Sequence, residues 1–249
     1  MERKISTNLY LIAFVISVVI FIAGISIGKL IDSSTITSLS SQLDKTSQRL
    51  ASIQLLLFTQ GNSSSFCPVY SSELGGIDKD VDDAGYKISY LEDIKGTYDP
   101  ELKKQYFTLE ANSYVLSKKF KELCGDRSVL LINFYSNKDC SNCKSQGSEI
   151  LNVRDNLRSQ NVSVKLFSFD GDLGSPIADA FKKQYSVTSY PSVVINERTY
   201  AGYQNSNKLT SLILSATKLD RPVTVTVNTT SNTTVNSSVN TIVNSTKTS

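Results

Sequence analysis

Residues 128–159 constrain the fold more than any other part of the sequence. The segment 129–135 is apolar and β-prone, as expected for a buried strand. The segment 147–159 carries apolar side chains at helical spacing, namely Ile150, Leu151, Val153 and Leu157. Cys140 and Cys143 lie between the two segments. The sequence therefore predicts a Cys-x-x-Cys pair at the point where a strand turns into a helix.

This position favours redox chemistry. The unpaired N–H groups and the dipole of a helix stabilise a thiolate at its first turn. We therefore expect Cys140 to be the nucleophile and Cys143, one turn further on, to be the resolving thiol. Half of a zinc site has the same spacing, but only two soft ligands lie close together and the chain has no histidine to complete a set. No metal is expected.

The stretch resembles the active-site unit of the thioredoxin superfamily. Residues 182–195 are similar to the approach to the cis-proline of that family, and residues 199–214 are similar to its last strand, glycine and closing helix. The resemblance covers about residues 126–218 and contains three separated motifs in the family's order. It implies an α/β thioredoxin-like fold, β-α-β-α-β-β-α, with a four-stranded mixed sheet.

The resemblance also implies a function and its residues. The catalytic pair would be Cys140 and Cys143, and the cis-proline would be Pro191, with Tyr190 and Pro191 contacting the substrate. The implied activity is thiol–disulfide exchange with protein thiols and disulfides, without a cofactor. Asn133 falls near the position of the family's buried proton-shuttling aspartate.

Two alternatives to an enzyme remain open from the residues alone. Cys140 and Cys143 could form an inert structural bridge, or the fold could serve only as a binding module at the cell surface. Composition excludes other classes more firmly. The chain has no histidine, which removes Ser-His and Cys-His hydrolase mechanisms. Its net charge is +3 with both signs mixed along the sequence, so nothing indicates a nucleic-acid partner.

The first part of the sequence predicts a membrane anchor. Residues 5–28 contain no charged side chain, and as a helix they would extend ~36 Å, enough to cross a ~30 Å hydrocarbon core and contact its lipid. A cleaved signal peptide is the alternative, but its apolar region is usually shorter. Arg3 and Lys4 favour a cytoplasmic N-terminus. We thus expect a single-pass signal anchor, an extracytoplasmic C-terminal domain and, for a reductase, a redox partner in the membrane.

Three amphipathic, coiled-coil-like segments follow the apolar run. Heptad spacing of apolar residues extends over residues 36–57, and similar seams run through 74–91 and 102–123. Short turns join the segments, so they are expected to pack as an antiparallel bundle. A parallel homodimer through residues 36–57 is the competing arrangement.

The other two cysteines are predicted to form a structural disulfide. The turn between the second and third helices centres near Thr97, with Cys67 30 residues before it and Cys124 27 residues after it. Residues at nearly equal distances from the turn of an antiparallel hairpin come back side by side. Two unrelated buried thiols are the alternative.

The end of the sequence is rich in Ser, Thr and Asn and has almost no charge, so it is expected to be disordered. Candidate N-glycosylation sites, by their Asn-x-Ser/Thr sequence, are Asn62, Asn161, Asn228, Asn232, Asn236 and Asn244. The predicted divisions of the chain are 1–29 (cytoplasmic end and anchor), 30–125 (helical region), 126–218 (thioredoxin-like domain) and 219–249 (disordered tail).

Overall fold

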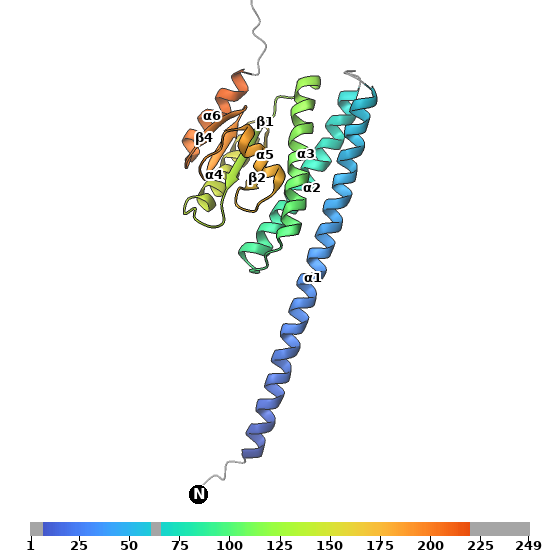
Figure 1. Cartoon of the computed structure of the whole chain (residues 1–249), viewed down its shortest axis with the longest axis vertical. Helices are drawn as coiled ribbons and strands as arrows, with labels where there is room; N and C mark the ends of the chain where they lie inside the picture. The colour runs from blue at the N-terminus through green and yellow to red at the C-terminus, as the bar shows by residue number, and fades with distance from the viewer. Residues whose placement is uncertain (1–6, 61–65, 220–249) are drawn as a thin grey trace, which may run out of the picture.

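The computed structural model describes residues 7–60 and 66–219, as a long helix, a helical hairpin and a small α/β unit (Figure 1). In chain order the elements are α1 (Thr7–Gln60), α2 (Cys67–Asp93), α3 (Pro100–Cys124), β1 (Val129–Tyr135), α4 (Cys143–Ser159), β2 (Val164–Asp170), α5 (Pro176–Gln184), β3 (Ser192–Ile195), β4 (Arg198–Ala201) and α6 (Ser206–Leu219).

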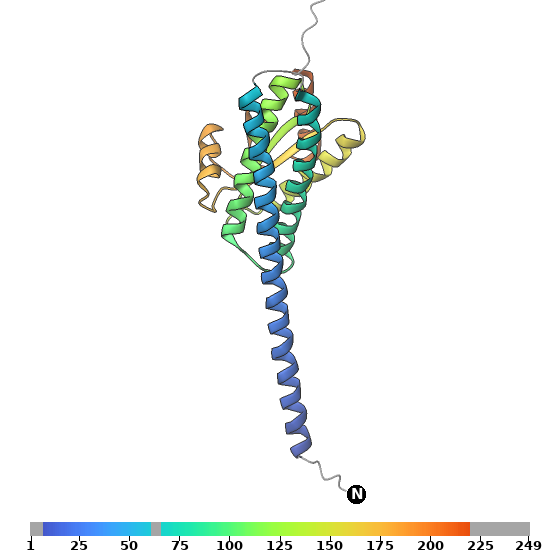
Figure 2. The ribbon, with the colours of Figure 1, turned by 90° about the vertical axis from the view of Figure 1, so that its right-hand side faces the viewer.

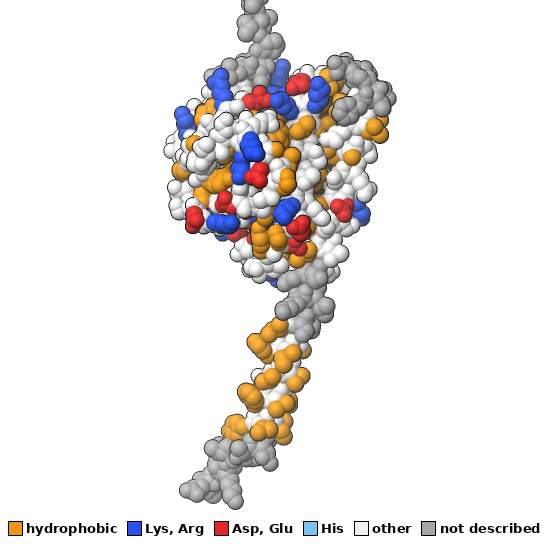
Figure 3. All heavy atoms as spheres, viewed as in Figure 1, with side chains coloured by type: hydrophobic (Ala, Val, Ile, Leu, Met, Phe, Trp, Pro, Cys, Tyr) orange, Lys and Arg blue, Asp and Glu red, His pale blue; other side chains and the backbone are white. Residues whose placement is uncertain are grey.

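The first half of α1 extends away from the other elements (Figures 1 and 2). Its apolar side chains between residues 10 and 25 are exposed, and they are visible as orange atoms in Figure 3. Among the residues that the structure describes, no helix is both long enough and apolar enough to cross a membrane. The predicted transmembrane helix over residues 5–28 is therefore wrong by this criterion.

The second half of α1 packs against α2 and α3 within the same chain. Its predicted seam is buried there, through Leu39, Leu43, Thr46, Leu50 and Ile53. Because these side chains already contact the hairpin, the structure gives no support to a homodimer through residues 36–57. Surface ion pairs follow the same contact, since Arg49 of α1 bonds to Glu73 and Asp80 of α2.

The hairpin of α2 and α3 has clear sequence signals at its ends. Asp99 caps α3, with its carboxylate accepting hydrogen bonds from the N–H groups of Glu101 and Leu102 at 3.0 Å each. Pro100 occupies the first helical position, where a missing N–H costs nothing. The helix ends at Gly125, whose φ of 66° is a left-handed conformation that suits glycine.

The α/β unit contains the four-stranded mixed sheet that the sequence predicts. The strand order is β2-β1-β3-β4. Strand β1 runs parallel to β2, with Val129 opposite Val164, and antiparallel to β3, with Phe134 opposite Ser192. A right-handed crossover through α4 is the usual connection between two parallel strands such as β1 and β2.

Helices cover both faces of this sheet. On one face, α4 and α6 pack on apolar side chains of β1 and β3, including Leu131 and Val193. On the other face, α3 and α5 pack on Ile132, Phe134 and Phe169, and this core is continuous with that of the helical bundle. The bundle thus shares the core on this second face of the sheet, while the core under α4 and α6 is separate from it.

Strand β2 is one of the two edge strands of the sheet, the other being β4, and α3 lies beside β2. The N–H of Ser168 in β2 donates a hydrogen bond to the carboxyl of Glu110 in α3. A side chain therefore satisfies an edge N–H group that a further strand would otherwise take. This contact helps to hold α3, and with it the helical region, beside the edge strand β2.

Candidate functional site

Cys140 and Cys143 lie just beyond the carboxyl end of β1. Cys143 is the first residue of α4, and Cys140 lies in the preceding loop. The two are joined in a disulfide with a Cα–Cα distance of 5.4 Å. Cys143 is buried, whereas Cys140 is half-buried. A nucleophile must be reached by its substrate and a resolving thiol need not be, so the geometry assigns Cys140 the outer position of the pair.

Backbone contacts hold the pair at the start of the helix. The N–H of Cys143 donates to the carbonyl of Cys140 at 3.3 Å, and the N–H of Ser136 donates to the Cys143 sulfur at 3.4 Å. The first turn of α4 contains no acidic residue, so no carboxylate there opposes a thiolate.

Lys144, the residue after Cys143, forms an ion pair with the helical region. Its ammonium bonds to the carboxylate of Asp93 in α2 at 2.8 Å, which offsets its charge. Both side chains are largely exposed, so this ion pair is weak. The interaction brings the end of α2 beside the start of α4. The helical region therefore reaches the surroundings of the cysteine pair.

The peptide bond between Tyr190 and Pro191 is cis. Pro191 directly precedes β3, whose first residue Ser192 lies opposite Phe134 near the end of β1. Ser136 follows that same end of β1 and contacts Cys143. The cis-proline and the cysteine pair therefore lie at the same end of the two central strands. The structure thus brings together Cys140, Cys143, Tyr190 and Pro191, the four residues predicted to catalyse and to bind substrate.

This is a thioredoxin-like fold. The structure has the features that the sequence analysis expected of this fold. They are the order and direction of the strands, the disulfide at the start of α4 and the cis-proline before β3. The four-stranded sheet and its flanking helices occupy residues 129–219. The N-terminal helices form the remainder of the described chain.

Comparisons with known proteins gave matches among solved structures alone. No family model matches the sequence, and no curated protein matches it. Among solved structures, chloroplastic thioredoxin z is similar with 13% identity and a TM-score of 0.31, covering 40% of this chain and 88% of that one. The thioredoxin Deadhead from Drosophila melanogaster has 21% identity and a TM-score of 0.30, covering 42% and 91%. The first thioredoxin domain of mouse protein disulfide-isomerase A4 has 15% identity and a TM-score of 0.30, covering 47% and 81%.

Tyr190 is wedged against the loop after β2. A Cβ atom added to Gly171 would overlap the Tyr190 ring and its hydroxyl, so only glycine leaves room for the ring. The ammonium of Lys182 in α5 lies 6.0 Å from the centre of the same ring and donates to the Gly171 carbonyl at 2.6 Å. Tyr190 therefore connects the cis-proline loop to β2 and α5.

A buried ion network lies beside the loop that carries Cys140, and the sequence analysis missed it. Lys103 of α3 is only 1% exposed, and its ammonium lies 2.9 Å from the Glu92 carboxylate and 3.5 Å from that of Asp170. Asp170, at the end of β2, also accepts a hydrogen bond from the Asn137 side chain at 3.1 Å. Lys103 is thus linked through two side-chain contacts to the loop between Tyr135 and Cys140.

Two tyrosine rings enclose the Lys103 ammonium, each with its centre 5.4 Å away, from Tyr98 and Tyr135. Burial, followed by the carboxylates of Asp170 and Glu92, raises the pKa of Tyr135 well above its ordinary value. Its phenol, which is protonated at neutral pH as in any tyrosine, therefore keeps its proton into more alkaline solution. No signal in the sequence marks Lys103 as buried. Lysine side chains are almost always exposed unless they are paired, so sequence reasoning assigns Lys103 to the surface.

Asn133 lies in β1, is only 4% exposed, and has a side-chain oxygen without a hydrogen-bond partner in the described part of the chain. Its amide is neutral, so it cannot take up and release a proton as a carboxylate does. Among the described residues, no group of three or more His, Cys, Asp or Glu side chains is placed to hold a metal ion.

The remaining predicted residues lie elsewhere. Cys67 and Cys124 form a second disulfide with a Cα–Cα distance of 5.6 Å, joining the start of α2 to the end of α3. Asn161 is exposed in the turn after α4, where its φ is 60°. The other candidate glycosylation sites lie outside the described residues, namely Asn62, Asn228, Asn232, Asn236 and Asn244. Glycosylation at all six stays a prediction.

Proposed function

We propose that this protein is a thiol–disulfide oxidoreductase that exchanges disulfides with protein substrates through Cys140 and Cys143. The observation that carries the proposal is the arrangement of the pair. A half-buried cysteine precedes a buried one at a helix start, and the cis-proline before β3 lies at the same end of the central strands. A structural bridge needs neither an accessible sulfur nor this neighbour.

The exchange balances within the pair and its substrate. In the reduced protein, the Cys140 thiolate attacks one sulfur of a substrate disulfide, forms a mixed disulfide and expels one substrate thiolate. The Cys143 thiol, on losing its proton, attacks the Cys140 sulfur and expels the second. The substrate gains two electrons, and Cys140 and Cys143 end as the disulfide in the structure. Substrate oxidation is the reverse sequence.

We further propose that the protein works in an oxidising compartment outside the cytoplasm. All four cysteines are paired, in two disulfides, and none is free. The bridge between α2 and α3 joins residues 57 positions apart and lies away from the redox pair, as expected of a structural disulfide. Stable structural disulfides are rare where glutathione and thioredoxin keep thiols reduced.

The test is turnover of an insulin-type disulfide substrate by the purified chain and by single cysteine variants. We expect Cys140→Ser to abolish turnover, because the attacking sulfur is lost. Cys143→Ser should accumulate a mixed disulfide on Cys140, because nothing resolves it, and non-reducing mass spectrometry would detect that adduct.

A matched control and a contrary result complete the test. Cys67→Ala/Cys124→Ala removes the other disulfide and should retain turnover at a temperature where the variant stays folded. Wild-type turnover by Cys140→Ser would instead leave the non-catalytic binding module as the function. Equilibration of the Cys140–Cys143 couple with glutathione then gives the direction of electron flow, through its reduction potential.

A further inference from the structure

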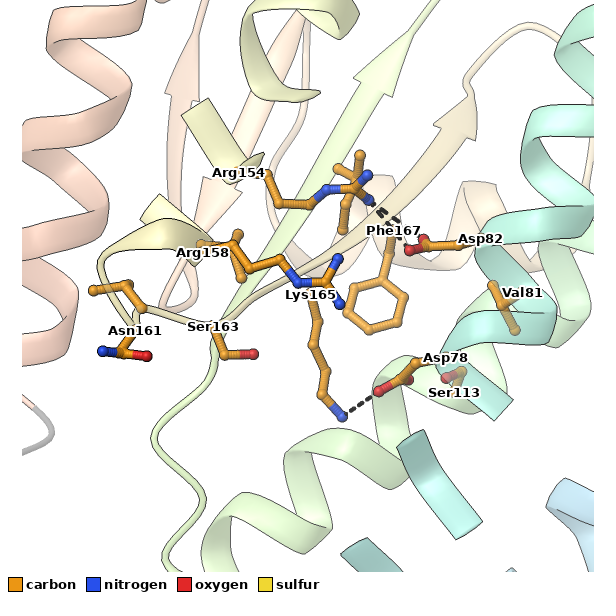
Figure 4. A pocket seen from close by; sticks show the side chains of 13 residues that line it. Asp78, Val81, Asp82, Ser113, Arg154, Arg158, Asn161, Ser163, Lys165 and Phe167 are labelled. Atoms are coloured by element: carbon orange, nitrogen blue, oxygen red, sulfur yellow. Dashed lines mark hydrogen bonds and ion pairs between the residues drawn. The ribbon is translucent and has the colours of Figure 1, made fainter. Parts of the chain in front are cut away.

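A cavity of about 320 Å³, lined by both charged and apolar side chains, opens between α2, the start of β2 and the end of α4 (Figure 4). It lies at the amino end of β2, whereas the cysteine pair follows the carboxyl end of the parallel strand β1. The two sites are therefore at opposite ends of the sheet. Residues 162–167 line the cavity, so part of its wall is the edge strand itself.

The backbone of β2 presents unused hydrogen-bonding groups on this side. The Ser163 carbonyl accepts from the Val129 N–H at 2.9 Å and so faces β1, whereas the Ser168 N–H faces away and donates to Glu110. Peptide groups alternate along a strand, so those of Val164 and Leu166 face away from β1 as well. Within the described residues, β2 has no second neighbouring strand. Glu110 covers the edge at Ser168, and the two preceding outward positions line the cavity.

The side chains around the cavity leave one positive charge in excess. Arg154 of α4 pairs with Asp82 at 3.4 Å, and Lys165 of β2 pairs with Asp78 at 2.8 Å. Arg158, one turn beyond Arg154, also lines the cavity and has no ion pair or hydrogen bond among the described residues (Figure 4). A negatively charged group entering here would complement Arg158.

A second polar group lines the cavity without a partner. Ser113 of α3 is fully buried, and its hydroxyl makes no hydrogen bond in the described part of the chain. Buried hydroxyls are normally paired, because an unsatisfied one loses its hydrogen bonds to water without replacement. The wall of the cavity therefore contains an unsatisfied polar group.

We propose that this edge of β2 binds a short extended segment of a partner polypeptide. The segment adds a strand opposite Val164 and Leu166, with its backbone N–H and C=O groups bonded to theirs, and it places an acidic side chain at Arg158. Strand addition draws affinity from the main chain and specificity from the flanking side chains. The site is independent of the redox chemistry, since none of the four cysteines lines it.

The probe is a blocked hexapeptide of alternating valine and threonine that carries one aspartate, titrated into the ¹⁵N-labelled full chain. We expect the amide resonances of Val164 and Leu166 to shift, and their hydrogen exchange to slow at least tenfold, on binding. Arg158→Glu should weaken binding about tenfold and should instead favour the peptide with lysine in place of aspartate. Lys183→Glu, on the exposed surface of α5, is the matched control and should bind as the wild type does.

Four results would overturn the proposal. They are no binding at millimolar peptide, equal binding of a peptide N-methylated at alternate amides, shifts centred on Pro191 rather than on Leu166, and equal binding of inorganic phosphate. The last would indicate an anion site without strand pairing. A chain carrying Cys140→Ser and Cys143→Ser should bind the peptide normally, so failure of the redox proposal and failure of this one are distinguishable.

Discussion

Glu110 is a carboxyl group buried in the interior of the protein. It is buried in α3, accepts a hydrogen bond from the Tyr106 hydroxyl, and accepts another from the Ser168 N–H. Burial outweighs both hydrogen bonds and raises the pKa of Glu110 to about 8, from 4.5. The carboxyl therefore keeps its proton in the folded protein at neutral pH, although the same group is ionised in the unfolded chain.

This difference predicts a pH dependence of stability. Between pH 4.5 and about 8 the folded state holds a proton that the unfolded state has lost, so the free energy of unfolding falls as pH rises through that window. Glu110→Gln removes the titration and should flatten this component, which amounts to at most about 5 kcal/mol. Urea unfolding at pH 5, 6.5 and 8 measures it as the difference between wild type and variant. Glu122→Gln, at an exposed position, is the control, and an identical slope in Glu110→Gln would contradict the assignment.

At the scale of elements, the loop after β2 positions the loop before β3. Gly171 supplies the surface against which the Tyr190 ring lies, and Tyr190 directly precedes the cis-proline. The Gly171 N–H also donates to the Tyr135 carbonyl at 2.8 Å, which ties this contact to the end of β1. Gly171 thus connects the loop after β2, the end of β1 and the loop before β3, which surround the cysteine pair, and its contact with Tyr190 requires that it lack a side chain.

Gly171→Ala should therefore impair catalysis more than folding. The added Cβ overlaps the Tyr190 ring, and displacing that ring moves Pro191 relative to Cys140. Misplacement by about 1 Å near a reacting centre can lower turnover up to about a hundredfold, and we expect a loss of at least about tenfold in kcat/KM for the insulin-type substrate. Gly147→Ala in α4 is the matched control, since its Cβ would meet no atom within 4 Å. Equal turnover by the two variants would show that the Tyr190 contact does not position the cis-proline.

At the scale of the whole molecule, the helical region and the thioredoxin-like unit fold as one body around a continuous core. Helix α3 carries both sides of that core, because it packs against α1 and α2 and against β2 and α5. Tyr114 shows the second contact, with its hydroxyl 2.5 Å from that of Tyr185 and its ring edge-on to Phe167 and Phe181. Destabilising the hairpin should therefore lower the free energy of unfolding of the whole molecule.

Removing the hairpin disulfide tests this dependence. In the chain-entropy account, a crosslink between positions 57 residues apart stabilises the folded state by about 4 kcal/mol, whereas one between neighbours three residues apart contributes about 2 kcal/mol. Cys67→Ala/Cys124→Ala should thus lower the free energy of unfolding more than Cys140→Ala/Cys143→Ala does, in a single cooperative transition. Two separate transitions in calorimetry would show instead that the hairpin and the sheet unfold independently.

The sequence by itself determined the elements whose causes are local. Apolar periodicity predicted the helices and strands, Asp99 and Pro100 marked the start of α3, and the Cys-x-x-Cys spacing placed the cysteine pair at a helix start. The same local reasoning predicted a membrane span over residues 5–28, whereas no described helix is both long enough and apolar enough to cross a membrane.

Only the tertiary structure decided what α3 faces on its second side. The stripe Lys103, Phe107, Glu110, Tyr114 and Ser117 is buried against the sheet, yet three of its five members are polar. No hydrophobic pattern can reveal such a stripe, because each polar member is buried only where a distant partner meets it. Glu92 and Asp170 meet Lys103, Ser168 meets Glu110, and Lys165 meets Ser117. These partners come from α2 and β2, and folding alone brings them to α3.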